Sequence, residues 1–249
     1  MELLPGAASW SHLTEGRRGA LCLHGFTGNP NSMRAVAEAF AAAGYHVELP
    51  RLPGHGTNID DMLQTTWVDW SGAAEAAYQR LAERADHIVV CGLSMGGSLT
   101  LHVALRHNDI RGLVCVNPAV QSQPDEVLNM VRGMIDEGTI TMPGIGSDIA
   151  DPESSETAYE GTPLPPLMSL MSGLAGQEQR YGELHMPLLL MTSEQDHVVD
   201  PDQSRYLAGA YGGEVEHVWM TRSYHVATLD YDAADIRERA VAFADRLCS

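Results

Sequence analysis

Short apolar runs alternate with segments of helical periodicity along most of this chain. The apolar runs expected to form β-strands are residues 19–24, 45–49, 87–92, 111–117, 187–193 and 214–220. Helical periodicity between them predicts helices over residues 31–43, 66–84, 96–107, 201–211 and 232–247. Continuous runs rich in Val, Ile and Leu are typical of parallel strands that are buried on both faces. The pattern therefore predicts an α/β fold with a mostly parallel, doubly wound sheet of about seven strands.

One interval, residues 121–182, interrupts this alternation. It contains Pro, Gly, Met and acidic residues but no convincing core strand. A structureless loop of that length is uncommon in a compact domain, so we expect an inserted subdomain, here called the cap. Residues 1–120 and 183–249 then form the core. The insertion follows the fourth predicted strand, which places the cap over the edge of the sheet where open α/β folds bind ligands.

The charge of the chain narrows the range of functions. It has 15 basic and 33 acidic residues, for a formal net charge of −18. Such a surface repels phosphate backbones, so we expect no nucleic-acid partner. Every basic residue is Arg, and the absence of Lys excludes a Walker lysine, a Schiff-base lysine and a Ser-Lys catalytic dyad.

The four cysteines are too few and too widely spaced for a disulfide framework or a zinc site. The N-terminal segment lacks the pattern of a signal peptide, and no window has 18 uninterrupted apolar residues. These features favour a reduced, cytoplasmic setting without a transmembrane segment, and we expect neither a metal ion nor another cofactor.

The segment Gly92-Leu93-Ser94-Met95-Gly96 matches the pattern G-x-S-x-G. The match alone is weak, because a chance occurrence in a chain of this length has odds of about one in ten. Its context is stronger, since it follows a predicted strand and begins a predicted helix, as a nucleophile elbow does. We therefore predict Ser94 as a nucleophile and the Met95 N–H as an oxyanion donor; the alternative is a Gly-rich turn with a capping serine.

A second loop supplies the expected partner of the Met95 N–H. His24-Gly25-Phe26-Thr27-Gly28 follows the first predicted strand. In hydrolases with a nucleophile elbow, the second oxyanion donor comes from the loop at this place in the chain. We assign that role to the Phe26 N–H and expect His24 to stabilise the loop through hydrogen bonds.

A serine nucleophile also needs a base and an orienting carboxylate, which follow it in the chain in the order acid, then histidine. Three acidic residues come after the fifth predicted strand: Glu194, Asp196 and Asp200. Asp200 precedes Pro-Asp-Gln and is explained as a helix N-cap, with Gln203 completing a capping box, while Glu194 comes too early, at the end of the strand. Asp196 is therefore the predicted acid, and His197 beside it is interpreted as a loop residue. Among the eleven histidines, His225 follows the last predicted strand and is the predicted base.

With these residues assigned, the chain resembles the bacterial monoacylglycerol lipases and the related small bacterial carboxylesterases. The stretches that carry the resemblance are LHGFTGNP (23–30), LPRLPGHGTNIDDM (49–62), GLSMGGSLTL (92–101), GSDIADPESSETAYEGTP (146–163), EQDHVVD (194–200) and SYHVATLDYD (223–232). The resemblance implies the α/β-hydrolase fold, the same triad of Ser94, Asp196 and His225, and the same oxyanion donors. It also implies a compact cap and a preference for glycerol monoesters.

A monoacylglycerol has an apolar tail and a polar head, so its site needs an apolar wall and a polar pocket. Apolar side chains recur at helical spacing in residues 127–135 and 164–174. Packing of the cap onto the core accounts for part of them, and the rest are expected to line an acyl tunnel. The methionines assigned to substrate contact are Met130, Met134, Met168 and Met171, because Met adapts to variable tails. Glu156 is expected to contact the glycerol hydroxyls; the alternative is an exposed carboxylate on a short helix.

The expected reaction is cleavage of a carboxylic ester through an acyl-enzyme, with a lipid ester as substrate and transient contact with lipid aggregates. A general short- or medium-chain carboxylesterase has the same catalytic motifs. An acyltransferase of this fold needs a second acceptor site. A non-catalytic binding module of the hydrolase fold remains a distant alternative, and such modules lose part of the triad.

Overall fold

A computed structural model describes residues 2–144 and 147–248 of the chain; Gly146, the first residue of one family-like stretch, lies outside them. Within these ranges, seven strands form one sheet in the order β1-β3-β2-β4-β5-β8-β9. Only β1 runs antiparallel to its neighbour. The strands are β1 (Trp10–His12), β2 (Arg18–Leu23), β3 (His46–Leu49), β4 (His87–Leu93), β5 (Gly112–Val116), β8 (Leu188–Ser193) and β9 (Val215–Met220). The predicted α/β class with a mostly parallel sheet is confirmed.

Six of these strands coincide with the predicted ones to within one residue at each end. Strands β2, β4, β5 and β8 are buried along almost their whole length. This burial on both faces explains why they read as continuous apolar runs. Strand β1 was not predicted, because an edge strand of three residues has too little apolar pattern to be recognised.

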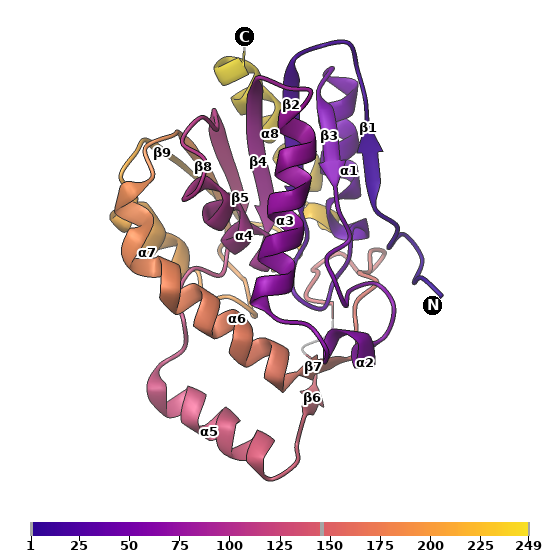
Figure 1. Cartoon of the computed structure of the whole chain (residues 1–249), viewed down its shortest axis with the longest axis vertical. Coiled ribbons are helices and arrows are strands. Elements are labelled where there is room, and N and C mark those ends of the chain that lie inside the picture. The colour runs from indigo at the N-terminus through magenta and orange to yellow at the C-terminus, as the bar shows by residue number, and fades with distance from the viewer. Residues whose placement is uncertain (1, 145–146, 249) are drawn as a thin grey trace.

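Helices cover both faces of the sheet, as Figure 1 shows. Helices α1 (Asn31–Ala42) and α8 (Ala233–Cys248) pack on one face. Helices α3 (Trp67–Ala82), α4 (Met95–Ala104) and α7 (Asp202–Ala210) belong to the core on the other face. The core between the sheet and helices α1 and α8 is called the first core, and the core on the face of α3, α4 and α7 the second. Alternate residues of a strand point to opposite faces, so Val90 packs in the second core and its neighbours Val89 and Cys91 pack in the first.

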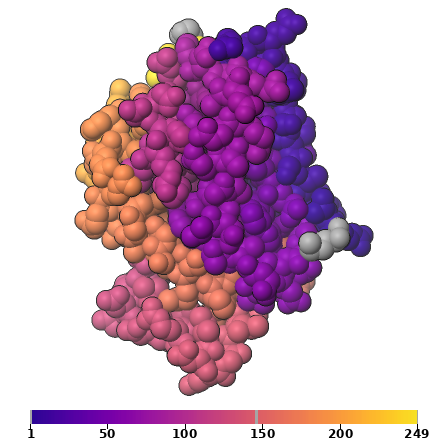
Figure 2. All heavy atoms as spheres, viewed as in Figure 1, coloured from indigo at the N-terminus to yellow at the C-terminus, as the bar shows by residue number. Residues whose placement is uncertain are grey.

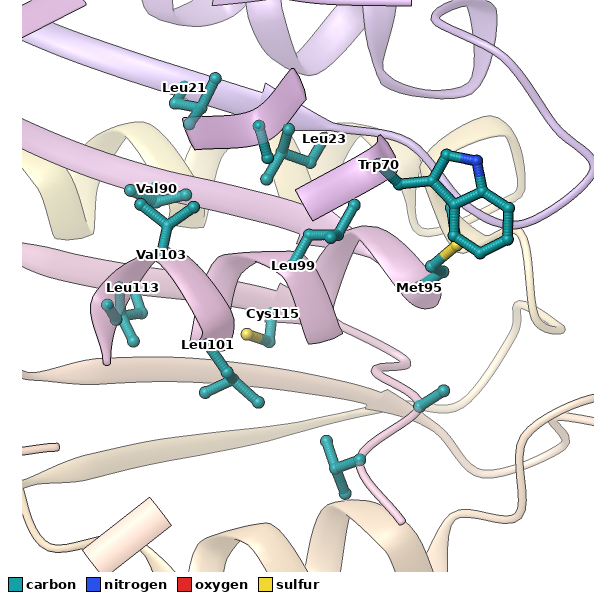
Figure 3. Packing of buried hydrophobic residues seen from close by; sticks show 14 of the residues in the cluster. Leu21, Leu23, Trp70, Val90, Met95, Leu99, Leu101, Val103, Leu113 and Cys115 are labelled. Carbon is teal, nitrogen blue, oxygen red and sulfur yellow. The ribbon is translucent and has the colours of Figure 1, made fainter. Parts of the chain in front are cut away.

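The second core reaches the end of the sheet where β4 passes into α4. Its members include Leu23, Trp70, Met95 and Leu99, and Figure 3 shows Met95 and Trp70 together at one end of this cluster. The Met95 side chain is completely buried. The start of helix α4 is thereby fixed by apolar packing beside the candidate nucleophile.

The cap consists of two helices and a small separate sheet. Its elements are α5 (Asp125–Asp136), β6 (Thr141–Pro143), β7 (Gly161–Pro163), α6 (Leu164–Gln177) and the 3₁₀ helix η1 (Glu178–Glu183). Strands β6 and β7 pair antiparallel, apart from the main sheet. Helix α6 buries six residues, whereas α5 buries Val131 alone. Figure 2 shows the α5 segment projecting from the body of the molecule, with a hollow between it and α6. The exact boundaries of the cap remain our prediction.

Two further short helices lie near the ligand edge of the sheet: α2 (Ile59–Met62) and the 3₁₀ helix η2 (Ala227–Leu229). No helix in the described part of the chain is long and apolar enough to cross a membrane.

Candidate active site

Ser94 stands at a sharp turn between strand β4 and helix α4. Its backbone has φ 56° and ψ −120°, a strained conformation for a residue with a side chain. A Cβ at Gly96 would lie 2.0 Å from the Leu23 carbonyl oxygen, and one at Gly92 would lie 2.1 Å from the Gly96 oxygen. Both glycines of the G-x-S-x-G pattern are therefore required by close backbone approach. The predicted strand–turn–helix setting of Ser94 is present.

The predicted acid and base are in direct contact. His225 Nδ1 donates to Asp196 Oδ2 at 2.7 Å, and the two side chains are only 8% and 1% exposed. Asp196 Oδ1 accepts the N–H groups of Val198 and Val199, both at 2.8 Å. These bonds fix the carboxylate and leave Nε2 as the acceptor nitrogen of the neutral imidazole. Ser94 and His225 line the same cavity.

Asn117, at the end of β5, joins the loops that carry the acid and the base. It has φ 45°, and its Nδ2 donates to the His225 carbonyl oxygen at 2.8 Å. Its Oδ1 accepts the Ser193 N–H at 2.7 Å, and Ser193 Oγ donates to the Tyr224 carbonyl oxygen. Sequence reasoning assigned Asn117 to a strand and missed this role, which depends on contacts 76 and 108 residues away.

The loop after β2 lies against Ser94. A Cβ at Gly25 would lie 3.3 Å from Ser94 Cβ, so glycine permits this approach. Met95 is the first residue of α4, and first-turn N–H groups have no partner within a helix. Among the described residues, neither the Met95 nor the Phe26 N–H donates a hydrogen bond. Both N–H groups are therefore available as donors on segments that adjoin Ser94, and their assignment to an oxyanion hole stays a prediction.

His24 supports this loop from beneath. Its Nε2 accepts the Leu52 N–H at 3.1 Å, and its Nδ1 donates to the Gly25 carbonyl oxygen at 3.0 Å. Burial holds the pKa of His24 well below its ordinary value, with a smaller contribution from the neighbouring His55. His24 is thus a neutral structural ring, in the place that the sequence predicted.

A cavity of about 360 Å³ opens beside Ser94 and His225, between the core and the cap. One part of its lining is apolar and comes from the cap helices, with Val127, Leu128 and Val131 from α5 and Leu167, Met168, Leu170 and Met171 from α6. Another part is polar and includes Thr27, Asp148, Glu156 and Thr162. An apolar wall and a few polar groups are typical of a site for an amphipathic small molecule.

The four methionines predicted to contact substrate divide into two pairs. Met168 and Met171 line the cavity. Met130 is 61% exposed, and neither it nor Met134 belongs to the lining, so the structure does not bring these two to the cavity. The apolar spacing of α5 predicted a stripe of contact residues but did not show which edge of that stripe faces the cavity.

The Glu156 carboxyl group extends into the cavity from an irregular segment, not from the short helix of the alternative interpretation. Its Oε1 lies 2.6 Å from where a Gly28 Cβ would stand, so glycine at position 28 makes room for it. The residue as a whole is half-buried, while its carboxyl group is enclosed by the walls. Burial raises the pKa of Glu156 to about 7, against an opposing effect of His225. No described residue donates a hydrogen bond to this carboxyl group.

Asp148 also lines the cavity, although no spacing or periodicity assigned it to the site. Its carboxylate accepts the backbone N–H of His225 at 3.0 Å and bonds His197 Nδ1 at 2.8 Å. His197 was expected to be a plain loop residue. The Asp148 and His197 positions lie 49 residues apart, and no periodicity or spacing connects them.

Two residues were expected to cap helix α7, and only one of them does so. Asp200 caps its start, accepting the Asp202 N–H at 2.9 Å, as expected. Gln203, expected to complete a capping box, instead accepts the N–H groups of Val120 and Gln121. That part of the prediction is wrong, because a long-range partner captures the side chain. Within residues 2–144 and 147–248, no cluster of three His, Cys, Asp or Glu residues suits a metal ion.

Comparison with known proteins shows the family of the chain. Residues 20–239 match the family described as the alpha/beta hydrolase family. The chain belongs to the α/β-hydrolase family. It is 43% identical over 244 residues to a thermostable monoacylglycerol lipase of Bacillus sp. strain H-257, covering 97% of this chain and 95% of that protein. It is 24% identical over 234 residues to a carboxylesterase of Bacillus subtilis strain 168, covering 93% and 94%.

Solved structures give the same fold. A structure from a study of LipS and LipT, two metagenome-derived lipolytic enzymes, superposes with a TM-score of 0.93 at 39% identity, covering 98% of this chain and 100% of that one. The monoacylglycerol lipase of Paleococcus ferrophilus superposes with a TM-score of 0.77 at 17% identity, covering 98% of each chain. The predicted α/β-hydrolase fold and the resemblance to lipases and esterases are confirmed.

Proposed function

We propose that this α/β-hydrolase is a serine hydrolase that cleaves monoacylglycerols to glycerol and a free fatty acid. The observation that carries the proposal is a single cavity lined by Ser94, by His225 with Asp196 bonded behind it, by an apolar wall and by the separate Glu156 carboxyl group. The broader class, carboxylic ester hydrolysis, is confirmed by the family and by lipolytic relatives that match along nearly the whole chain.

The first half of the reaction forms an acyl-enzyme. Ser94 Oγ attacks the ester carbonyl carbon while His225 Nε2 takes the hydroxyl proton. Asp196 holds the imidazole in the required tautomer and stabilises its charged form. The negative charge on the former carbonyl oxygen is stabilised by the N–H groups of Phe26 and Met95. The C–O bond to glycerol then breaks, and His225 returns the proton to the departing glycerol oxygen.

The second half releases the fatty acid. Water attacks the acyl carbon of the Ser94 ester, and His225 accepts a proton from that water. The same two N–H groups stabilise the second oxyanion, after which the bond to Ser94 Oγ breaks and the serine recovers its proton. Every charge in this sequence is met by groups of the chain itself, so the proposed mechanism uses no cofactor.

Substrate selection follows from the two kinds of lining. The apolar side chains of α5 and α6, among them Met168 and Met171, supply a wall for the acyl chain. The Glu156 carboxyl group accepts no hydrogen bond from residues 2–144 and 147–248 and lies beside the oxyanion loop, where an alcohol leaving group would emerge. With its pKa raised to about 7, a substantial fraction of the group is protonated near neutral pH, and this form can both donate to and accept from hydroxyl groups.

A hydrolysis profile tests the proposed substrate class. Rates are measured on mono-, di- and triacylglycerols of several chain lengths and on a short simple ester, with the S94A variant as the blank. Monoacylglycerols should have the highest kcat/KM, because the enclosed polar end of the cavity accommodates glycerol but not a second acyl chain. Faster hydrolysis of the short simple ester than of monolaurin would instead identify a general carboxylesterase.

Substitution of Glu156 tests the proposed head-group contact. E156A should lower kcat/KM on monolaurin about 10-fold, since one or two hydrogen bonds are lost, and change p-nitrophenyl laurate turnover less than about twofold. E156Q keeps a donor and an acceptor and should retain most of the monolaurin activity. Equal losses on both substrates in E156A would contradict the contact.

The proposal also includes transient contact with neutral lipid aggregates. Helix α5 supplies one wall of the cavity, while Met130 on the same helix is exposed together with Ile140 and Met142 beyond its end. Acidic residues at both ends of α5 repel anionic lipid, so an uncharged aggregate is the better partner. We propose a reducing, cytoplasmic setting as well, supported by four cysteines that are all free and buried.

A further inference from the structure

The cap contacts the loops of the acid and the base through one carboxylate. Asp148 belongs to the cap segment between β6 and β7, and its side chain is only 10% exposed. It lies beside neither Asp196 nor His225 in the sequence, yet it bonds the loops of both. No other role in the proposed reaction accounts for a carboxylate at this place.

The contacts of Asp148 are made mainly through backbone groups. Its Oδ2 accepts the His225 N–H at 3.0 Å and the His197 N–H at 3.2 Å. Its Oδ1 bonds His197 Nδ1 at 2.8 Å, and its carbonyl oxygen accepts the Val226 N–H at 3.0 Å. One residue of the cap is therefore hydrogen-bonded to His197, which follows the predicted acid, and to the predicted base His225 and its neighbour Val226.

The segment that carries Asp148 is itself anchored. The Asp230 carboxylate, which is buried, accepts the N–H groups of Ala150 and Asp151 from the cap and of Tyr224 from the base loop. Asp148 is thus held from two sides and cannot follow a movement of the cap without breaking these bonds. These bonds restrain the position of Asp148, so that it can in turn restrain the two catalytic loops.

We propose that Asp148 is a positioning residue, which sets the distance between the acid loop and the base loop through the His197 and His225 contacts. The inference rests on the proposed function of Ser94, Asp196 and His225. Loss of the carboxylate would leave three donors of these loops without their acceptor, and the partly buried N–H of His225 would be the most costly to leave unpaired. The loops would shift to find other partners, and a displacement of about 1 Å at catalytic groups is enough to lower a rate about 100-fold.

The positioning role differs from substrate contact in its kinetic signature. Asp148 lines the cavity, so a role in binding would raise KM when it is removed. A positioning role lowers kcat and leaves KM within about threefold, because the substrate still binds and the triad is misplaced. The same role lowers the rate at which a fluorophosphonate labels Ser94.

The test uses the whole chain with p-nitrophenyl butyrate, a substrate too small to depend on the polar end of the cavity. D148A should lose about 10- to 100-fold in kcat. D148N should recover to within about threefold of the wild type, since its carbonyl oxygen accepts the backbone N–H groups and its amide donates to a neutral His197 ring. H197A, which breaks only the Oδ1 contact, should lose less than D148A. D151A is the matched control, because the Asp151 side chain bonds only the Glu153 N–H in its own segment.

The outcomes separate clearly. Wild-type kcat as low as that of S94A would contradict the proposed function, independently of Asp148. With an active wild type, unchanged kcat in D148A, a loss confined to KM, or equal losses in D148N and D148A would each overturn the positioning role. Thermal unfolding of all variants is followed in parallel; should D148A fail to fold, the comparison of D148N and H197A with the wild type decides, and an unchanged kcat in H197A then overturns the proposal.

Discussion

The nucleophile elbow and helix α5 of the cap form two walls of one cavity, and they are built in opposite ways. At the elbow, a Cβ on Gly96 would lie 2.0 Å from a backbone oxygen, while a Cβ on Gly133 in α5 would meet nothing within 4 Å. The residues of α4 from Met95 to Leu101 are all buried, whereas α5 buries only Val131. The elbow therefore has no space for a larger side chain, whereas most side chains of α5 are not buried.

This difference matches the two proposed tasks of the cavity, which are catalysis at the elbow and selection of the acyl chain at the cap. In the proposed mechanism, attack on an ester uses Ser94, His225 and two N–H donors at fixed positions, and the closely packed backbone around Ser94 holds the nucleophile in place. Acyl chains vary in length and conformation, and the wall that meets them is a loosely packed helix whose contact side chains are aliphatic. The cap differs in how firmly its parts are held: α5 is loosely packed, whereas the segment around Asp148 is hydrogen-bonded to the catalytic loops.

A pair of glycine substitutions tests the contrast directly and should have the largest effect. G96A should lower the free energy of unfolding by at least about 3 kcal/mol, since the methyl group displaces backbone. G133A should raise it by up to about 1 kcal/mol, because alanine favours a helix and has open space at this position. Urea unfolding measures both. A G96A protein as stable as the wild type would show that the elbow is not as constrained as described.

The pH dependence of stability comes from the core side of the site. His55 is fully buried, with Nδ1 bonded to the Pro53 carbonyl oxygen and no partner for Nε2 among the described residues. Burial lowers the pKa of His55 to about 4. The unfolded chain, with a value of about 6.5, therefore binds more protons between these limits, and stability falls as the pH drops through this window.

The H55N variant isolates this contribution. Asparagine keeps the bond to Pro53 and does not titrate, so the wild type should lose about 2 kcal/mol more than H55N between pH 7 and pH 5. Urea unfolding at the two pH values measures it, with the exposed His185 replaced by Asn as a control. Parallel losses in the wild type and H55N would mean that His55 does not contribute. His24 acts in the same direction, so a residual slope in H55N is expected.

A smaller effect distinguishes the two faces of the cap. M168A removes part of the cavity wall and should lower kcat/KM for monopalmitin about 10-fold relative to a short ester, because apolar contact with the tail is lost. M130A, at an exposed position, is the matched control and should change this ratio less than about twofold. Equal effects of the two variants would contradict the assignment of the wall.

The smallest expected effect concerns lipid aggregates. M130S should lower the rate on monolaurin above its critical micelle concentration about two- to threefold and leave the rate below it unchanged, because only the aggregate meets the exposed face of α5. Kinetics on both sides of that concentration measure it. An equal change on both sides would remove the aggregate contact from the proposal.

Local pattern was sufficient for six of the seven described strands of the sheet and for the elbow. Buried parallel strands such as β4 and β5 read as continuous apolar runs, and Ser94 is recognisable from a strand, a tight turn and a helix in immediate succession. Asp196 and His225 followed from their order after the serine. Each of these features depends on a short segment of the sequence or on the order in which strands and helices follow one another.

Features that depend on distant partners escaped prediction. Asp148, Asn117 and His197 are polar residues of loops or strand ends, and their roles arise only when three loops meet. Met130 and Met134 were assigned to the cavity because helical spacing shows an apolar stripe without its orientation. Even the Gln203 capping box failed, because the side chain reaches Val120 instead.

Covalent labelling of Ser94 tests the central claim most directly. Wild-type protein treated with a fluorophosphonate should gain one adduct, which peptide mass spectrometry locates at Ser94. S94A should gain none and should lose at least about 10⁴-fold in esterase activity. An inert wild type, or labelling that persists in S94A, would contradict the assignment of this site as the catalytic centre.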